Sequence, residues 1–467
     1  MLKLQKLERI LKLMRLTRDR LFYKTALNIA IPIALQNLIT FSVSMADTIM
    51  VGRLGEVQLS SVAIANHLQF ILMVLILGVG SGASVMAAQY YGKKDIDSIH
   101  KVMAIMYRVC IIITIIFILV AIFIPKQFMN IYTTDKEVIL QGIKYLKILS
   151  ISYIFYSLTN CTISVLRSVK TVKISLIVYS ISLIVNIFFN WVFIFGKFGI
   201  KPMGISGAAI ATVISRFTEF ITTLTFIIYF EKKIHLNFKD LIKLDNRIIR
   251  LFTKTSTPII LNELFWAIGS SMISIIVGRL GREVVAGNSI NNVTNQFATL
   301  FIFGLSSASS VIIGNTIGKG DYEKVKEYAN TICILSFIMG ILSGVIILIL
   351  RPFIVNLYNV SDYTKYIAKQ IMISTALVSV FKSISSNVMM GVLRGGGDNR
   401  FVFISEMIFM WLVSIPLGFL GAFVFKLPVF IVFLIIKSDE ILKAIAGIFR
   451  VRSEKWIVDV TKNDFDK

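Results

Sequence analysis

An internal repeat with an offset of 226 residues is the feature that most constrains how this chain folds. The pentapeptide VGRLG at positions 51–55 returns at positions 277–281. Single positions match at the same offset, among them Pro32 with Pro258, Gly78 with Gly304, and Gly92 with Gly318. A repeat of this kind predicts two halves that share one fold, with equivalent helix ends at equivalent positions.

Long apolar stretches fill both copies of the repeat. Hydrophobic residues make up 56% of the 467 residues, and they fall in stretches of about 20, the length that spans a bilayer as a helix. We therefore predict an all-α polytopic membrane protein with twelve transmembrane helices. The predicted spans are 25–51, 59–88, 102–124, 138–164, 173–195, 204–230, 251–278, 284–316, 328–350, 366–392, 401–422 and 428–449.

The even number of spans in each copy sets the symmetry of the repeat. Six spans return the chain to the side from which it started, so the copies are parallel repeats, which are typical of two-lobed secondary transporters. We predict an N-lobe at 25–230, a cytoplasmic linker at 231–250 and a C-lobe at 251–450. A basic amphipathic segment at 1–24 and a cytoplasmic tail at 451–467 flank them. Pro32 and Pro258 are expected at helix starts, and Gly52 and Gly278 at helix ends.

The net charge of +23 is explained by topology rather than by nucleic acid. Eight Lys and Arg residues lie in 1–24 and six in 231–250, two segments predicted on the same side of the membrane. The positive-inside rule then predicts a multi-pass plasma (inner) membrane protein with both termini in the cytoplasm. A phosphate-cradling loop, a His/Cys metal cluster and a nucleophile–base pair are absent from the sequence, so we expect no ATP, no cofactor and no enzyme activity. Nothing in the sequence requires an oligomer, so we expect a monomer.

Several motifs resemble those of the multidrug and toxic compound extrusion (MATE) family. They are ADTIMVGRLG at 46–55, YGKKD at 91–95, GISGAAIAT at 204–212, GVLRGGGD at 391–398 and the stretch from Trp411 to Pro416. The resemblance covers about residues 25–457. It implies a V-shaped, two-lobed antiporter that exports bulky, often cationic organic compounds, driven by inward movement of Na⁺ or H⁺.

Ionisable residues at membrane depth are costly, so they are candidates for function. Asp47 lies near the end of the first span, where the resemblance implies a coupling carboxylate; the alternative is an acid hydrated from the loop. Asn186 and Asn190 are predicted to complete a polar site with Asp47, or simply to form hydrogen bonds between helices. Some family members carry a second acid where this chain has Asn190, which argues against two carboxylates sharing one proton.

Glu263 and Lys382 form the second candidate site. Their predicted depths are similar, so we expect an ion pair, either fixed or released when Glu263 takes a proton or a cationic substrate. In some MATE proteins the tenth span supplies an acid to a Na⁺ site beside a Glu of the seventh span, but this chain has no acid within its tenth predicted span, 366–392. The sequence does not distinguish Na⁺ from H⁺ as the coupling ion; if the ion is Na⁺, its site is expected near Asp47 or near Glu263.

The remaining candidates are polar residues in other spans. Glu406 is predicted to be alone, so a role in coupling or in structure is open. Arg216 and Glu219 are three apart and predict a structural pair. The alternating charges of the last span predict helix pairing or the lining of a cavity. Further candidates for contact with the substrate are Gln36, Asn37, Asn66 and Asn292.

Together these features predict a cation-coupled antiporter that exports organic compounds from a lipid bilayer by alternating access. The alternative is a flippase for a lipid-linked saccharide or another amphiphile, since such proteins share the two-lobed architecture. An unpaired cluster of cations in the central cavity would favour the flippase.

Overall fold

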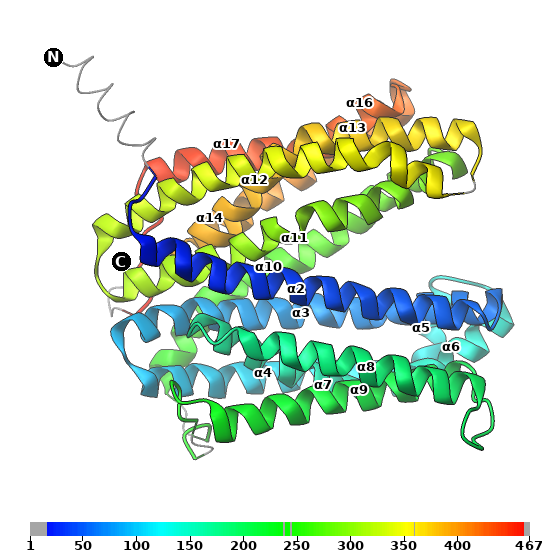
Figure 1. Ribbon diagram of the computed structural model, residues 1–467, viewed down its shortest axis with the longest axis horizontal. Coiled ribbons are helices and arrows are strands. Elements are labelled where there is room, and N and C mark those ends of the chain that lie inside the picture. The colour runs from blue at the N-terminus through cyan, green and yellow to red at the C-terminus, as the bar shows by residue number, and fades with distance from the viewer. Residues whose placement is uncertain (1–15, 237–238, 243–244, 359, 462–467) are drawn as a thin grey trace. The chain divides into compact units, whose positions relative to one another are not determined.

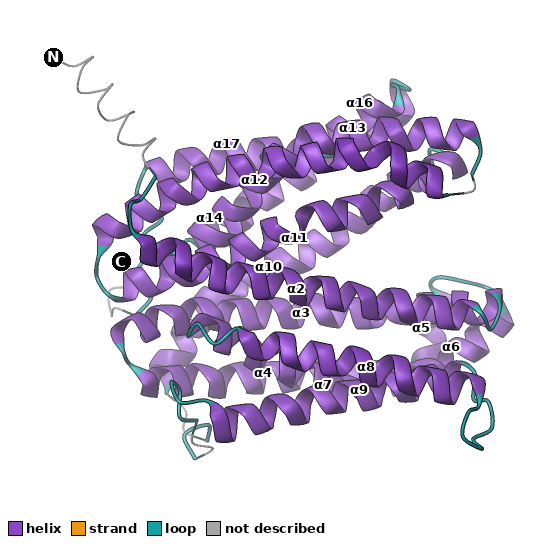
Figure 2. Cartoon of the chain, viewed as in Figure 1, coloured by secondary structure: helices purple, strands orange, loops and turns teal. Residues whose placement is uncertain are grey.

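The computed structural model describes residues 16–236, 239–242, 245–358 and 360–461. These residues form helices joined by loops, and the described ranges contain no strand (Figure 2). This agrees with the predicted all-α class. Residues Leu4, Leu7, Leu11 and Met14 of the predicted amphipathic segment lie outside the described residues.

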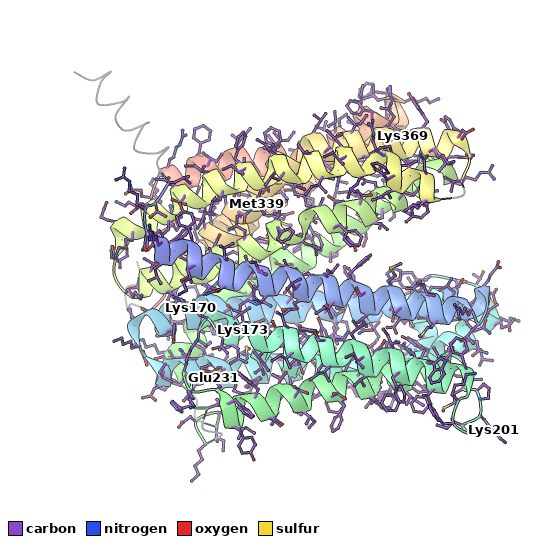
Figure 3. The ribbon with its side chains drawn as sticks, viewed as in Figure 1. Lys170, Lys173, Lys201, Glu231, Met339 and Lys369 are labelled. Carbon is purple, nitrogen blue, oxygen red and sulfur yellow. The ribbon has the colours of Figure 1, made fainter. Side chains whose placement is uncertain are left out.

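In the first half of the chain, the described residues form eight α-helices followed by a short π-helical stretch. They are α2 (Arg20–Gly52), α3 (Glu56–Lys93), α4 (Ile96–Phe123), α5 (Pro125–Asn130), α6 (Lys136–Leu149), α7 (Ser152–Ser168), α8 (Lys173–Phe195), α9 (Ile205–Thr225) and η1 (Phe226–Phe230). The longest of them run side by side in Figure 1. Lys201 and Glu231 lie at opposite ends of this bundle, so α9 and η1 cross its whole length (Figure 3).

The second half has the same order of long helices with more breaks near its end. Its elements are α10 (Asn246–Gly278), α11 (Arg282–Gly318), α12 (Tyr322–Leu357), α13 (Asp362–Ser385), η2 (Ser386–Leu393), α14 (Asn399–Glu406), η3 (Met407–Ser414), α15 (Ile415–Phe419), η4 (Leu420–Val424), α16 (Val429–Ile436) and α17 (Ser438–Arg452). The π-helical η3 lies just before Pro416, whose ring cannot fit against the carbonyl four residues earlier in a regular α-helix. The wider turn relieves that clash.

Ten of the twelve predicted spans are continuous apolar helices in the described residues, and the other two are interrupted. Within the described residues, ten helical stretches are long and apolar enough to cross a membrane, and α6 with α7 makes an eleventh that bends by 51°. The predicted span 428–449 consists of α16 and α17, which are interrupted at Lys437. Charged residues in α17 keep this pair from being one continuous apolar helix.

The repeat is visible in matched helix ends. Gly52 and Gly278 are the last residues of α2 and α10, as predicted. Asp95 and Asp321 cap α4 and α12, where their side chains accept hydrogen bonds from backbone amides three residues later. The prediction that the matched prolines mark helix starts was wrong. Both lie inside their helices, because polar residues upstream continue each helix, and neighbouring helices can compensate the lost hydrogen bond.

Contacts between residues divide the chain into two compact units, each of which has its own interior. Within the described residues, unit 1 contains the chain up to Ala34, Ala88–Lys94 and everything from Leu264 onward; unit 2 contains Leu35–Ala87 and Asp95–Glu263. The predicted lobe boundaries at 25–230 and 251–450 remain a prediction.

Close backbone approach holds α12 and α13 together in unit 1. Gly340 and Gly344 lie one turn apart on α12, and a Cβ added to Gly340 would lie 2.6 Å from the Cα of Val380. Ser379 of α13 donates a hydrogen bond to the Gly340 carbonyl at 3.0 Å. Small residues at this spacing are typical of helices that pack tightly within a membrane.

The end of the chain packs into unit 1. Trp456 is fully buried and lies against Gly396 in the turn after η2. The Gln89 side chain donates to the Val458 carbonyl at 3.1 Å and accepts from the Val460 amide at 2.8 Å. The predicted tail is therefore, as far as residue 461, an ordered part of unit 1.

The segment between α9 and α10 is attached to unit 2 through α4. His100 Nε2 is 2.8 Å from the Ile234 carbonyl oxygen, and Arg108 donates to the Ile242 carbonyl at 3.0 Å. Lys101 Nζ lies 3.0 Å from Asp245, and this hydrogen bond lowers the pKa of the Asp245 carboxyl below its usual range.

Candidate functional site

Asp47 lies near the end of α2 in unit 2, where α8 provides it with amide partners. Asn190 Nδ2 donates a hydrogen bond to Asp47 Oδ1 and another, at 3.0 Å, to Asn186 Oδ1. Asn186 and Asn190 are one turn apart, so they lie on the same face of α8. Both are buried, whereas Asp47 is half-buried. The three residues predicted to form one polar site are therefore in contact, while their role in transport remains a prediction.

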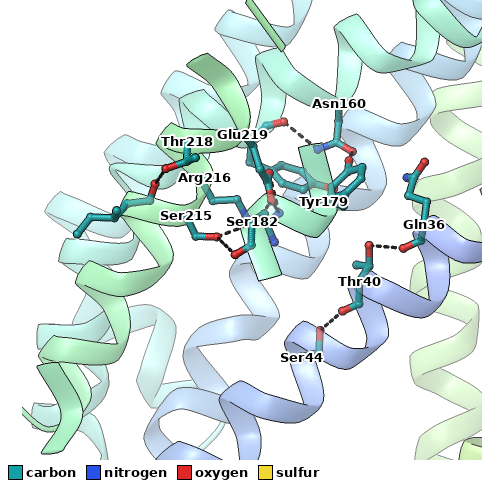
Figure 4. A network of polar contacts seen from close by, with 12 residues as sticks. Gln36, Thr40, Ser44, Asn160, Tyr179, Ser182, Ser215, Arg216, Thr218 and Glu219 are labelled. Atoms are coloured by element: carbon teal, nitrogen blue, oxygen red, sulfur yellow. Dashed lines mark hydrogen bonds and ion pairs between the residues drawn. The ribbon is translucent and has the colours of Figure 1, made fainter. Parts of the chain in front are cut away.

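A buried ion pair lies deeper in the same unit. Arg216 Nη1 donates to both carboxylate oxygens of Glu219, at 2.8 and 2.9 Å, as the three-residue spacing on α9 predicted. Ser182 of α8 donates a hydrogen bond to Glu219 and is 2.7 Å from the Ser215 hydroxyl (Figure 4). The guanidinium also lies 5.1 Å from the centre of the Tyr156 ring. These contacts replace the water that both charges lose on burial.

The Arg216–Glu219 pair belongs to the same unit as Asp47 and has no net charge of its own. With Asp47 ionised, the group formed by Asp47, Arg216 and Glu219 carries one net negative charge. A proton or a monovalent cation at Asp47 makes the group neutral. Because charge is costly at membrane depth, binding of a single cation relieves an energetic cost at this place.

The Asp47 site also contains an oxygen suited to a hard cation. Among the described residues, Asn190 Oδ1 is buried without a hydrogen-bond partner, and it belongs to the side chain that contacts Asp47. Carboxylate and amide oxygens are the ligands that hard cations prefer. The described residues contain no cluster of three or more His, Cys, Asp or Glu side chains that would hold a metal ion. Asp47 and Asn190 thus bring a carboxylate and an amide oxygen into one site.

A stripe of polar residues on α2 leads toward Asp47. The hydroxyls of Thr40 and Ser44 donate to the carbonyls of Gln36 and Thr40, one turn earlier in each case (Figure 4). The Gln36 side chain accepts a hydrogen bond of 3.4 Å from Arg167. Asn37, the next residue on α2, is half-buried. Gln36 thus has a structural partner, which the sequence did not suggest.

Glu406 in unit 1 is not alone, contrary to the prediction. Lys443 of α17 lies 3.3 Å from the Glu406 carboxylate, 2.8 Å from Asp439 and 3.7 Å from Glu440. Ser385 of α13 donates to Glu440 at 2.6 Å. The partner was missed because it lies on a helix 37 residues further along the chain. The alternating charges of the last span do pair helices, as predicted.

Lys382 belongs to unit 1 and Glu263 to unit 2. Lys382 lies 5.9 Å from the centre of the Phe303 ring. Glu263 is buried in α10. The hypothesised pair between them therefore remains a hypothesis, as do both its fixed and its switching forms.

Asn66 and Asn292 occupy matched positions on α3 and α11. Both side chains are exposed. Tyr145 donates a long hydrogen bond of 3.5 Å to Asn66. Their contact with a solute remains a prediction.

Sequence reasoning predicted Asn186 and Asn190 but missed Ser182, which donates a hydrogen bond to Glu219 of the buried pair. Ser182, Asn186 and Asn190 recur every fourth residue along α8, and this polar stripe was a usable signal for a polar face. Tyr179 of α8 donates to Asn160 of α7 at 3.0 Å (Figure 4), a contact between helices that no local pattern indicates.

Comparison with known proteins reproduces the internal repeat. The MatE family model matches the chain twice, over residues 32–192 and 258–420, with the same offset of 226 residues between the starts. The chain belongs to the MATE family. It is thus a multi-pass membrane protein of that family, as the sequence motifs predicted.

Relatives and solved structures of MATE proteins cover most of the chain. A probable multidrug resistance protein NorM of Thermotoga maritima is 24% identical over 93% of both chains. The multidrug resistance protein MdtK of Pectobacterium atrosepticum is 25% identical over 84% of this chain and 86% of its own length. A crystal structure of MATE in complex with MaL6 matches with a TM-score of 0.85 and 16% identity, over 95% of this chain and 97% of that one. These likenesses establish the MATE fold.

Proposed function

We propose that this MATE protein exports small organic cations from the cell by antiport with Na⁺ or H⁺. Two relatives that align with 84% or more of the chain are named as a multidrug resistance protein and a probable multidrug resistance protein. The observation that carries the coupling proposal is the contact between Asp47, Asn190 and Asn186, beside the buried Arg216–Glu219 pair. No observation favours the flippase.

In this mechanism the coupling cation binds at the Asp47 carboxylate and neutralises it. Asn190 and Asn186 hold the Asp47 carboxylate in position. The positive charge of Arg216 is balanced by the negative charge of Glu219. A cation drives transport only if it binds one facing state more tightly than the other. Movement of one charge across 100 mV is worth about 2.3 kcal/mol, which is enough to sustain a substantial gradient of the exported compound.

The proposed orientation puts both termini in the cytoplasm of a plasma membrane protein that acts as a monomer and without ATP. Lys170, Lys173 and Glu231 lie at one end of unit 2, the end at which the 231–250 segment begins, and Lys201 lies at the other (Figure 3). The 231–250 segment carries six Lys and Arg residues, which supports the inward direction of that end.

The test is efflux of a fluorescent organic cation such as ethidium from proteoliposomes, under an imposed Na⁺ gradient and then under a pH gradient. We expect efflux under one of the gradients and its loss in Asp47→Asn. Glu56→Gln is the matched control, because Glu56 is exposed in the first turn of the following helix. Full efflux in Asp47→Asn would refute the role of Asp47, and absence of efflux by the wild type under both gradients would refute the proposed function.

A further inference from the structure

Unit 2 contains a pocket that shares no residue with the Asp47 site. Its volume is about 270 Å³, and α4, α7, α9, η1 and the segment after η1 form its walls. The side chains that matter for its chemistry are Tyr107, Thr159, Thr162, Thr223, Leu236 and Leu241. Most of the remaining lining consists of Leu, Ile and Phe.

Two hydroxyls in this apolar lining have no partner. Thr159 and Thr223 are 0% and 2% exposed, and among the described residues neither Oγ1 forms a hydrogen bond. Threonines in helices normally donate to the carbonyl four residues earlier. The adjacent Thr222 does so at 2.7 Å. A buried hydroxyl without a partner is unfavourable, so both groups would gain from a ligand that bonds to them.

Two further hydroxyls in the pocket already have a partner. Tyr107 and Thr162 are joined by a hydrogen bond of 2.7 Å between α4 and α7. Apart from Tyr107, the lining contains no ionisable side chain. The lining offers the hydroxyls of Thr159 and Thr223 for hydrogen bonds, but no charged side chain that could pair with a charged ligand. The pocket therefore selects an uncharged ligand.

The outer wall of the pocket is held in place. Leu236 and Leu241 form it, and the segment that carries them is bonded to α4 by His100 and Arg108. Both bonds are to backbone carbonyls, at Ile234 and Ile242. The pocket is therefore a preformed site, as small-molecule sites usually are.

We propose that this pocket binds an uncharged aromatic or alicyclic alcohol or ketone of about two fused rings. Its volume is nearly twice the ~150 Å³ of an engineered apolar cavity that takes up benzene, which indicates a bicyclic body. The hydroxyls of Thr159 and Thr223 bond the polar group of the ligand, and the apolar lining contacts its rings.

The test measures binding of 2-naphthol and naphthalene to the purified full-length protein in nanodiscs, by equilibrium dialysis against empty nanodiscs. We expect saturable binding of 2-naphthol, at least tenfold tighter than that of naphthalene. The double variant Thr159→Val/Thr223→Val keeps the side-chain shape and should bind the two probes equally. Thr222→Val is the matched control and should retain the preference, because its hydroxyl is bonded to its own helix.

Three outcomes would overturn the proposal. The first is equal binding of both probes by the wild type, which would mean partition into an apolar space. The second is an unchanged preference in the double variant. The third is binding of 2-naphthol only after delipidation, with displacement by added phospholipid, which would assign the pocket to an acyl chain. Asp47→Asn should not alter binding, so failure here is distinguishable from failure of the proposed transport.

Discussion

Asn190 of α8 donates a hydrogen bond to the carboxylate of Asp47 on α2, a residue 143 positions earlier in the chain. The contact joins α2 to the buried polar stripe of α8. It places an amide beside Asp47, the one acid in the part of α2 that belongs to unit 2. An amide in this position orients the carboxylate without competing for its cation. Several expectations depend on this arrangement and on the packing around it.

Replacement of Asn190 by Ala should weaken cation-coupled efflux. A hydrogen bond to a charged group contributes about 1.5–3 kcal/mol, so the apparent affinity for the coupling ion should fall by about 10-fold or more. Initial efflux rates measured against the concentration of the coupling ion report this change. Ser175→Ala on the same helix is the control, because Ser175 bonds only to the Val172 carbonyl. Equal ion dependence in the Asn190 and Ser175 variants would contradict the prediction.

Replacement of Glu219 by Ala should destabilise the protein strongly. The change leaves the Arg216 guanidinium buried without its acid, a cost of about 3–5 kcal/mol. Thermal unfolding in detergent should show a large fall in midpoint. The double variant Arg216→Met/Glu219→Leu removes both charges and should recover much of the loss. If the double variant is less stable than Glu219→Ala, the unpaired charge of Arg216 is not the cause of the loss of stability.

The charge cluster of unit 1 should respond unequally to removal of its members. Lys443→Met leaves Glu406, Asp439 and Glu440 without their shared cation, so a loss of about 3–5 kcal/mol is expected. Glu406→Gln leaves Lys443 paired with Asp439 at 2.8 Å, and its loss should be clearly smaller. Thermal midpoints of the two variants give the order, and the reverse order would contradict the central place of Lys443.

The contact between α12 and α13 should not tolerate a large side chain. Gly340→Leu forces the helices apart where a Cβ alone would lie 2.6 Å from backbone, and overpacking of this kind costs about 1–3 kcal/mol or more. Ile341→Leu, at the adjacent and exposed position, should be neutral. Unfolding in detergent measures both, and similar stability of the two variants would show that the helices separate freely.

The end of the chain should be a structural part of unit 1. Trp456→Ala removes a fully buried ring, at a cost of about 3–5 kcal/mol. The loss should expose the segment from Ser453 to Thr461 to proteolysis. Limited digestion followed by mass spectrometry locates the cuts. Lys455→Ala, at an exposed neighbour, is the control, and resistance of Trp456→Ala to cleavage would contradict the prediction.

The sequence predicted the features that depend on residues close to one another in the chain. Apolar stretch length predicted the spans, and the repeat predicted the matched ends at Gly52 and Gly278. The pairing of Arg216 with Glu219 follows from their spacing within one helix. Each of these depends on residues a few positions apart, so a single chain read in order is enough to predict them.

Contacts between distant helices were decided by the tertiary structure alone. The pairing of Glu406 with Lys443, the hydrogen bond between Ser182 and Glu219, and the bonds of Gln89 to the end of the chain all join separate elements. The sequence itself determined the family, the membrane class and the polar face of α8. The packing of many side chains at once sets the rotation and depth of each helix, and therefore decides which charged side chains meet. No pattern within a short segment contains that information.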